Sequence, residues 1–149
     1  QGDMTRGLGP FRDDDDVHDH GGYFASINRN KRSVVLDLKQ RDAREILLKL
    51  VDGADVLVEN FRNMVMDNWG LSYESLCERN PKLIYATVRG FGDQRSGKSP
   101  YVEWPAFDIV SQAMGGIMGI TGPDQATPTK IGPGVGDIIP GTMLAFGVV

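Results

Sequence analysis

Apolar and polar positions follow one another along the chain in short blocks that predict strands and helices in turn. Three blocks are near-continuous apolar runs rich in β-branched residues, which is typical of buried strands, and they cover residues 33–38, 56–59 and 83–88. Residues 41–51 and 73–79 instead repeat apolar side chains at helical spacing. This order predicts an α/β fold: a Rossmann-like parallel sheet with helices on both faces.

Charges and chain breakers support both helical assignments. Asp42 lies early and Lys49 lies late in residues 41–51, as the helix dipole favours. Ser72 is a suitable N-cap for the second helix, and Asn80-Pro81 ends it.

The second half of the chain alternates between loops and apolar segments. Residues 107–118 predict a helix whose last turn is weakened by Gly115-Gly116. Residues 92–100 and 121–129 are rich in glycine, proline and polar side chains and predict loops. The apolar run at residues 142–149 predicts the start of a final helix, and because it has no closing signal we expect a fragment of a longer protein.

Residues 2–22 show no helical or strand period and predict a loop. They hold the acidic run Asp13–Asp16, followed by His18, Asp19 and His20, which are residue types that bind divalent metals. Clustered like charges repel one another and are solvated, so we predict a solvated loop here and no metal site.

Composition limits the classes of function. The 149 residues suggest one domain, and a net charge of −4 gives no general attraction to nucleic acid or to an anionic membrane. No apolar run is long enough to cross a bilayer. Cys77 is the only cysteine, which excludes an internal disulfide and fits a reducing compartment, so we expect the cytoplasm, or an organelle matrix in a eukaryote.

Two sets of residues are candidates for binding an anionic ligand. Arg29, Lys31, Arg32 and Lys39 form the densest positive region, and they are either solvated surface charges or contacts to phosphate groups. Parallel sheets bind ligands at the carboxyl ends of their strands, which points to residues 60–62 and 89–92.

The glycine-rich stretch at residues 130–141 places one carboxylate, Asp137, before the final apolar run. Glycines allow backbone amides to approach a ligand closely, and unpaired N–H groups at a helix start favour negative charge. Asp137 is therefore either a helix cap or a reactive carboxylate in a polarised pocket.

Motifs in colinear order cover nearly the whole chain outside the acidic loop. They are Gly2-Asp3-x-Thr5-Arg6, Asn28–Ser33 with Leu36–Lys39, Ala54–Phe61, Asn80–Ala86, Gly90–Gly92, Phe107-Asp108, Gln112–Gly116, Thr121-Gly122 and Gly136-Asp137 with Gly141. Together these motifs resemble the family III CoA-transferases, the group that contains formyl-CoA transferase, carnitine CoA-transferase and the α-methylacyl-CoA racemases.

The resemblance implies that Asp137 is the nucleophile, which carries the reaction through an aspartyl anhydride and an aspartyl-CoA thioester. An Asp with an ordinary pKa near 4 is ionised at neutral pH and needs no histidine to activate it. The backbone amides of Gly134 and Gly136 are candidates to stabilise the oxyanion intermediates. The CoA site implied by the resemblance runs along Leu36, Lys39, Asn60, Phe61, Arg62, Phe107 and Asp108.

The resemblance also implies that residues 1–149 are part of a large CoA-binding domain without its N-terminal strand and helix and without the C-terminal portion. We expect the full protein to be an interlocked homodimer that uses acyl-CoA and a small carboxylic acid as substrates, with no permanently bound cofactor. The fragment alone is expected to be inactive.

Two other functions stay open. Racemases of this family pair their aspartate with a histidine where this chain has Phe107, and phenylalanine cannot carry a proton, so transfer is favoured over racemisation. A non-catalytic CoA-binding module is the other alternative.

Overall fold

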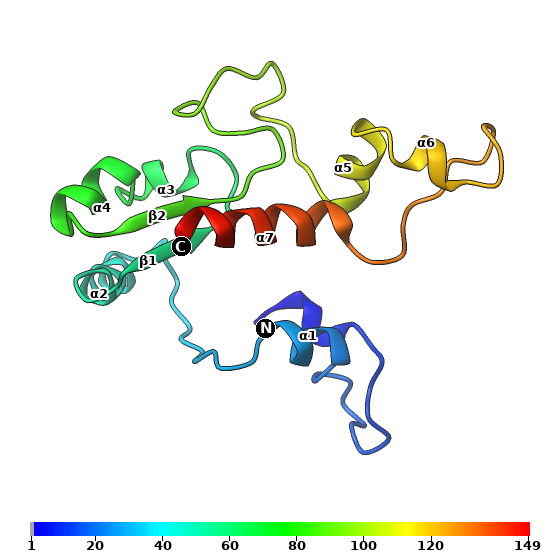
Figure 1. Cartoon of the computed structure of the whole chain (residues 1–149). Helices are drawn as coiled ribbons and strands as arrows, with labels where there is room; N and C mark the ends of the chain where they lie inside the picture. The colour runs from blue at the N-terminus through cyan, green and yellow to red at the C-terminus, as the bar shows by residue number, and fades with distance from the viewer. Residues whose placement is uncertain (1) are drawn as a thin grey trace. The chain divides into compact units, whose positions relative to one another are not determined.

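The computed structural model describes residues 2–149, which form two compact units, one up to Asp37 and one from Leu38 to Val149 (Figure 1). The first unit contains a 3₁₀ helix, η1 (Met4–Gly7), and the helix α1 (Gly22–Ile27). The Arg6 guanidinium lies 4.0 Å from the centre of the Phe24 ring, a cation–π contact. A Cβ atom at Gly21 would lie 2.0 Å from a backbone oxygen, so the chain can pass here only as glycine.

The prediction of a loop without regular structure over residues 2–22 is wrong for η1. Asp3 Oδ1 accepts a hydrogen bond from Thr5 N over 2.9 Å and caps the 3₁₀ helix. Asp15 accepts from His20 N over 3.1 Å, so this carboxylate stabilises a turn. Among residues 2–149, no three His, Cys, Asp or Glu side chains are arranged to hold a metal ion.

The strand predicted at residues 33–38 is also wrong. These residues have no regular structure, and Val34 and Val35 are 62% and 92% exposed. A β-branched run becomes a strand only when a second strand satisfies its backbone groups. Across residues 2–149 no segment pairs with it.

The sheet of the second unit has two parallel strands, β1 (Val56–Glu59) and β2 (Ile84–Thr87). They pair in register, from Val56 opposite Ile84 to Glu59 opposite Thr87. The crossover between them contains α3 (Val65–Asn68) and α4 (Tyr73–Arg79). The predicted α/β class with a parallel sheet is therefore confirmed, with the strands at residues 56–59 and 83–88 close to their predicted bounds.

The predicted helix at residues 41–51 is confirmed as α2 (Arg41–Val51), and the helix at residues 73–79 is confirmed as α4. Ser72 caps α4, because its hydroxyl accepts a hydrogen bond from Ser75 N. Together with α3 and the strands, these helices enclose the core. Its buried side chains are Val51, Met66, Leu71, Leu76 and Leu83.

The last part of the chain forms α5 (Asp108–Met114), α6 (Met118–Thr121) and α7 (Val135–Val148). The helix predicted at 107–118 is thus broken, as the glycine pair indicated. Helix α7 begins seven residues earlier than predicted and contacts both α5 and β2 (Figure 1).

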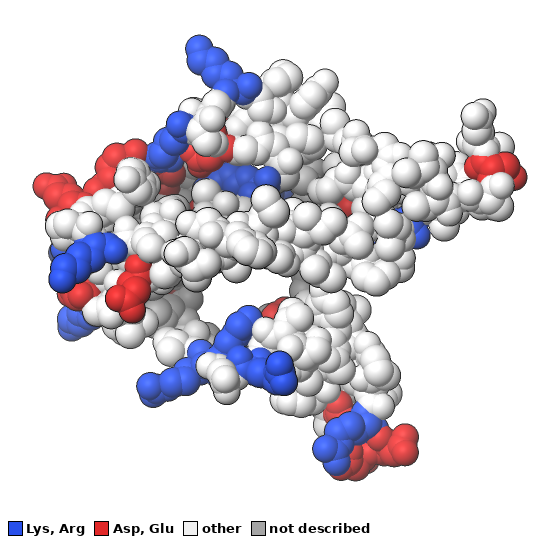
Figure 2. All heavy atoms as spheres, viewed as in Figure 1, with Lys and Arg blue, Asp and Glu red and all other residues white. Residues whose placement is uncertain are grey.

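Helix α7 has two unusual features. Pro140 lies inside it and has no N–H, so the carbonyl of Gly136 receives no hydrogen bond four residues on. Its only charged residue is Asp137, and most of the surface along α7 is uncharged in Figure 2. Across residues 2–149 every helix is too short or too polar to span a membrane.

Candidate active site

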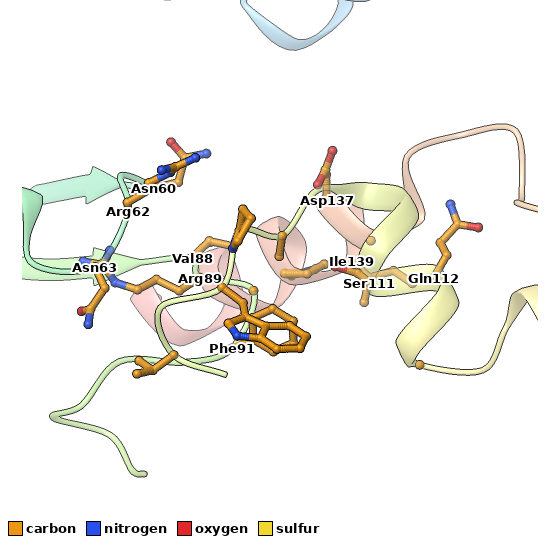
Figure 3. Close-up of a pocket in the computed structure, with 18 of the residues that line it drawn as sticks. Asn60, Arg62, Asn63, Val88, Arg89, Phe91, Ser111, Gln112, Asp137 and Ile139 are labelled. Atoms are coloured by element: carbon orange, nitrogen blue, oxygen red, sulfur yellow. The ribbon is translucent and has the colours of Figure 1, made fainter. Parts of the chain in front are cut away.

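A cavity of about 490 Å³ opens where β1 and β2 end (Figure 3). Its walls come from the loop after β1 at residues 60–63, the loop after β2 at residues 88–91, residues 102–106, α5, and the start of α7. Ligands bind at the carboxyl ends of parallel strands because the connecting loops leave a crevice there. The cavity is therefore the candidate active site of the second unit.

Asp137 lines this cavity from the first turn of α7. Its backbone N–H donates to Gly134 O over 3.0 Å, so the backbone is held while the carboxylate accepts no hydrogen bond from any residue between 2 and 149. Partial removal from water raises the pKa of Asp137 above its ordinary value, and the nearby Asp108 carboxylate raises it further. An unpaired, more basic carboxylate at a cavity wall is suited to nucleophilic attack.

Asp108 lies beside Asp137 but is fully engaged. Its Oδ1 accepts from Gly136 N over 2.8 Å and from Gln112 Nε2 over 2.9 Å. Its Oδ2 lies 3.0 Å from Gln112 Nε2 and 3.5 Å from Lys130 Nζ. These contacts lower the pKa of Asp108, the Gln112 hydrogen bond most. The two neighbouring carboxylates therefore differ: one is paired and the other is available.

The Gly136 amide is thus already in use. An oxyanion role for this N–H requires that a substrate oxygen replace Asp108 Oδ1 as its acceptor. Val135 N donates to Pro133 O over 2.8 Å, whereas the Gly134 N–H has no acceptor within the described part of the chain. The predicted oxyanion roles of Gly134 and Gly136 stay predictions.

The opposite wall of the cavity is fixed by a buried ion pair between Glu59 and Arg89, whose side chains are 3% and 7% exposed and 2.7 Å apart. Glu59 Oε2 accepts from Phe61 N over 2.8 Å, and Arg89 donates to Phe61 O. Both ends of the pair therefore hold the loop that carries Asn60 and Arg62. In Figure 3 the side chains of Asn60, Arg62 and Asp137 extend to the same side of the cavity.

The structure brings five of the predicted site residues, Asn60, Phe61, Arg62, Gly136 and Asp137, to this cavity. The other predicted CoA contacts lie elsewhere. Phe107 caps α5 and is 68% exposed without lining the cavity. Lys39 is exposed on the second unit, and Leu36 is half-buried in the first. Their contact with CoA, and that of Asp108, stay predictions.

Sequence reasoning missed Gln112 and Lys130, which partner Asp108, and Trp104, which lines the cavity near Phe91. A signal for Gln112 was present, because side chains four residues apart on a helix face one another and Gln112 follows Asp108 at this spacing. Lys130 and Trp104 lie outside helices and strands and carry no such local signal.

The sequence model of a family described as "CoA-transferase family III" matches residues 1–149. The succinyl-CoA:mesaconate CoA-transferase of Haloarcula hispanica is 48% identical over 148 residues, which are 99% of this chain and 37% of that protein. The acetyl-CoA:oxalate CoA-transferase of Acetobacter aceti is 43% identical over 99% of this chain and 36% of its own length. The chain therefore spans about a third of the length of these relatives.

A crystal structure of a CAIB/BAIF family protein from Brucella suis has a similar fold. It is 40% identical in sequence, superposes with a TM-score of 0.79, and covers 87% of this chain and 33% of its own. The family match over the whole chain agrees with the resemblance carried by the colinear motifs. The chain belongs to CoA-transferase family III.

Proposed function

We propose that the complete polypeptide containing this chain transfers CoA from an acyl-CoA thioester to a carboxylic acid, with Asp137 as the covalent carrier. The observation that carries the proposal is the Asp137 carboxylate, which lies on the cavity wall without a hydrogen-bond partner among residues 2–149 while its backbone is held. The names of the family III relatives support the reaction class.

The first half of the reaction loads CoA onto the protein. An Asp137 oxygen attacks the thioester carbonyl, the carbon–sulfur bond breaks, and CoA leaves as the thiolate. The product is a mixed anhydride between Asp137 and the acyl group. The thiolate then attacks the Asp137 carbonyl carbon, which releases the donor's carboxylate and forms an aspartyl-CoA thioester.

The second half runs the same steps in reverse with a new acid. The acceptor carboxylate attacks the aspartyl-CoA thioester, the thiolate leaves again, and a second anhydride forms. Attack of the thiolate on the acceptor's acyl carbon gives the new CoA thioester and restores the Asp137 carboxylate. No proton or electron is gained or lost over the cycle, which agrees with the absence of a histidine among the residues that line the cavity.

The names of the relatives support the choice of both substrates. We assign CoA contacts to Leu36, Lys39, Asn60, Phe61 and Arg62, with Phe107 and Asp108 as further members of the set. The names of the two relatives give mesaconate and oxalate as carboxylic acids, and each is a dicarboxylate. We therefore assign a small dicarboxylate as acceptor.

The complete protein is proposed to be a homodimer. Support comes from apolar side chains at the surface of the sheet and of α7: Val58, Ile84, Met143 and Phe146 are 42% to 74% exposed. Contiguous exposed apolar surface marks a site of further association. Light scattering of the complete protein would contradict a dimer if it gave the mass of one chain.

Covalent trapping tests the role of Asp137. The complete protein is incubated with succinyl-CoA, treated with hydroxylamine and analysed by peptide mass spectrometry, and we expect a hydroxamate on Asp137. The Asp137→Ala variant is the matched control and should give neither hydroxamate nor turnover. Normal turnover by Asp137→Ala would overturn the proposal. Calorimetry of Lys39→Ala tests the CoA site, where unchanged affinity removes Lys39 from it.

A further inference from the structure

Three side chains, Asp108, Gln112 and Lys130, connect α5 to the glycine-rich turn before α7. Gln112 is central to this group and only 2% exposed. Its Nε2 donates to both oxygens of Asp108, and its Oε1 accepts from Ile131 N over 2.8 Å. One buried amide thus joins α5 to the turn and satisfies both of its ends.

Lys130 closes the same turn from the outside. Its Nζ donates to Ile131 O over 2.8 Å and to Gly132 O over 3.0 Å, and lies 3.5 Å from Asp108 Oδ2. The ammonium group therefore holds the turn through two backbone carbonyls and partly neutralises the Asp108 carboxylate. Gln112 and Lys130 together hold the Asp108 carboxylate in the orientation that the structure shows.

That orientation reaches the nucleophile through one bond. Asp108 Oδ1 accepts from the N–H of Gly136, the residue directly before Asp137. There is no room for adjustment at this point, since a Cβ atom at Gly136 would lie 2.9 Å from both Asp108 O and Ser111 Cβ. Contacts with α5 therefore fix the position and direction of the first turn of α7.

We propose that Gln112 and Lys130 are positioning residues for CoA transfer by Asp137. They act through Asp108 and Gly136 and do not touch the reacting atoms. This inference rests on the proposed function. A misplacement of a reacting group by about 1 Å can lower a rate about 100-fold. We expect an effect of this size when the contacts of Gln112 with Asp108 and the turn are lost.

The first variant is Gln112→Met in the complete protein, because methionine has a similar length and no hydrogen-bonding amide. We expect kcat and the rate of hydroxamate formation on Asp137 to fall about 100-fold, with the KM for acyl-CoA changed less than about threefold. A purely structural role would reduce the amount of folded enzyme and leave the kcat of the folded fraction unchanged. Gln125→Met, on an exposed loop, is the matched control and should behave as wild type.

The pH profile of Gln112→Glu gives a second readout. The charged groups around this position are Asp108, its partner Lys130, and Asp137, which lines the same cavity as Gln112. The introduced carboxyl group repels Asp108 when it is ionised, whereas in its protonated form it donates to Asp108 as the amide does. Activity relative to wild type should therefore rise as the pH falls. An unchanged or falling ratio would contradict the positioning role.

Lys130→Met decides the question if the Gln112 variants do not fold, because the Lys130 side chain is 40% exposed and its loss leaves no cavity. Loss of its hydrogen bonds to Asp108 and the turn should lower kcat about tenfold or more, while the exposed control Lys98→Met has no effect. Wild-type kcat in Lys130→Met overturns the inference. If wild-type protein itself gives no hydroxamate, the proposed function fails instead, so the two failures are distinguishable.

Discussion

Replacing Arg89 by methionine should destabilise the second unit more than any change to its exposed ion pairs. The Glu59 and Arg89 side chains are almost fully buried, and their charged atoms lie 2.7 Å apart. Arg89→Met also takes a 3.2 Å contact from Asp93, and it leaves the Glu59 charge in a poorly solvated place, with only Phe61 N and the Tyr85 hydroxyl as remaining donors. Breaking a buried pair in this way costs about 3–5 kcal/mol of unfolding free energy.

Urea denaturation followed by tryptophan fluorescence measures this cost. Trp69 packs against the core and is the reporter, in a background where Trp104 is replaced by phenylalanine. With a slope of about 1.5 kcal/mol per molar urea, the midpoint of Arg89→Met should fall by about 2–3 M. The matched control is Arg79→Met, which breaks an exposed pair with Asp52 and should cost less than about 1 kcal/mol.

The double variant Glu59→Gln/Arg89→Met separates the loss of the pair from the burial of an unpaired charge. Because glutamine removes the charge that Arg89→Met leaves unpaired at position 59, the double variant should be more stable than Arg89→Met alone. Equal midpoints for Arg89→Met and Arg79→Met, or strictly additive effects in the double variant, would refute the reasoning.

Three further predictions concern the first turn of α7, the pH dependence of stability and the packing of the core. Gly136→Ala places a Cβ within 2.9 Å of α5 atoms, so it should cost about 1–3 kcal/mol of unfolding free energy in thermal unfolding and slow CoA transfer about 100-fold. Gly141→Ala, which has open space around it, should have neither effect. A fully active Gly136→Ala would contradict the close contact. Pairing with Arg95 lowers the pKa of Glu74 to about 2, so the stabilising effect of the pair is present above the ordinary pKa near 4.3 and is lost as the pH falls towards 2. An NMR titration should show the Glu74 midpoint rising towards 4.3 in Arg95→Gln. An unmoved midpoint would exclude the pair as the cause of the low pKa. Leu76 is fully buried, and Leu76→Ala should cost about 2–5 kcal/mol by urea denaturation, so a loss below about 1 kcal/mol would mean that the core collapses around the gap.

The elements that sequence reasoning predicted well are those whose signals are local. Helices α2 and α4 have the predicted bounds because dipole charges, the Ser72 cap and the Asn80-Pro81 break all lie within a few residues. The strand expected at residues 33–38 failed because a strand needs a partner, and no local feature of Val34 or Val35 shows whether one exists.

The start of α7 failed for the opposite reason. Glycines and Pro140 disfavour a helix around residues 134–141, which pointed to a start at Thr142. The structure shows a helix from Val135, since Asp108 on α5 satisfies the Gly136 N–H from 28 residues away in sequence. Only tertiary contacts supply that bond.

Only part of the candidate site could be predicted from the sequence. Motifs pointed to Asp137 and to residues 60–62, which line one cavity. The groups that hold them in place are Arg89, Gln112 and Lys130, and their importance comes from partners that are distant in sequence. Candidate site residues occur in recognisable motifs, whereas the residues that hold them in place can be identified only from contacts in the folded structure.

The position of the core in the sequence has a consequence for how the protein is made. All five buried side chains of the core lie between Val51 and Leu83, so the core is complete in the nascent chain well before Asp137 is synthesised. At about 5–20 residues per second, the ribosome takes about 3–11 s to add the intervening residues. The sheet and its helices can therefore collapse before α7 is synthesised, so Asp137 is added beside a sheet that has already folded.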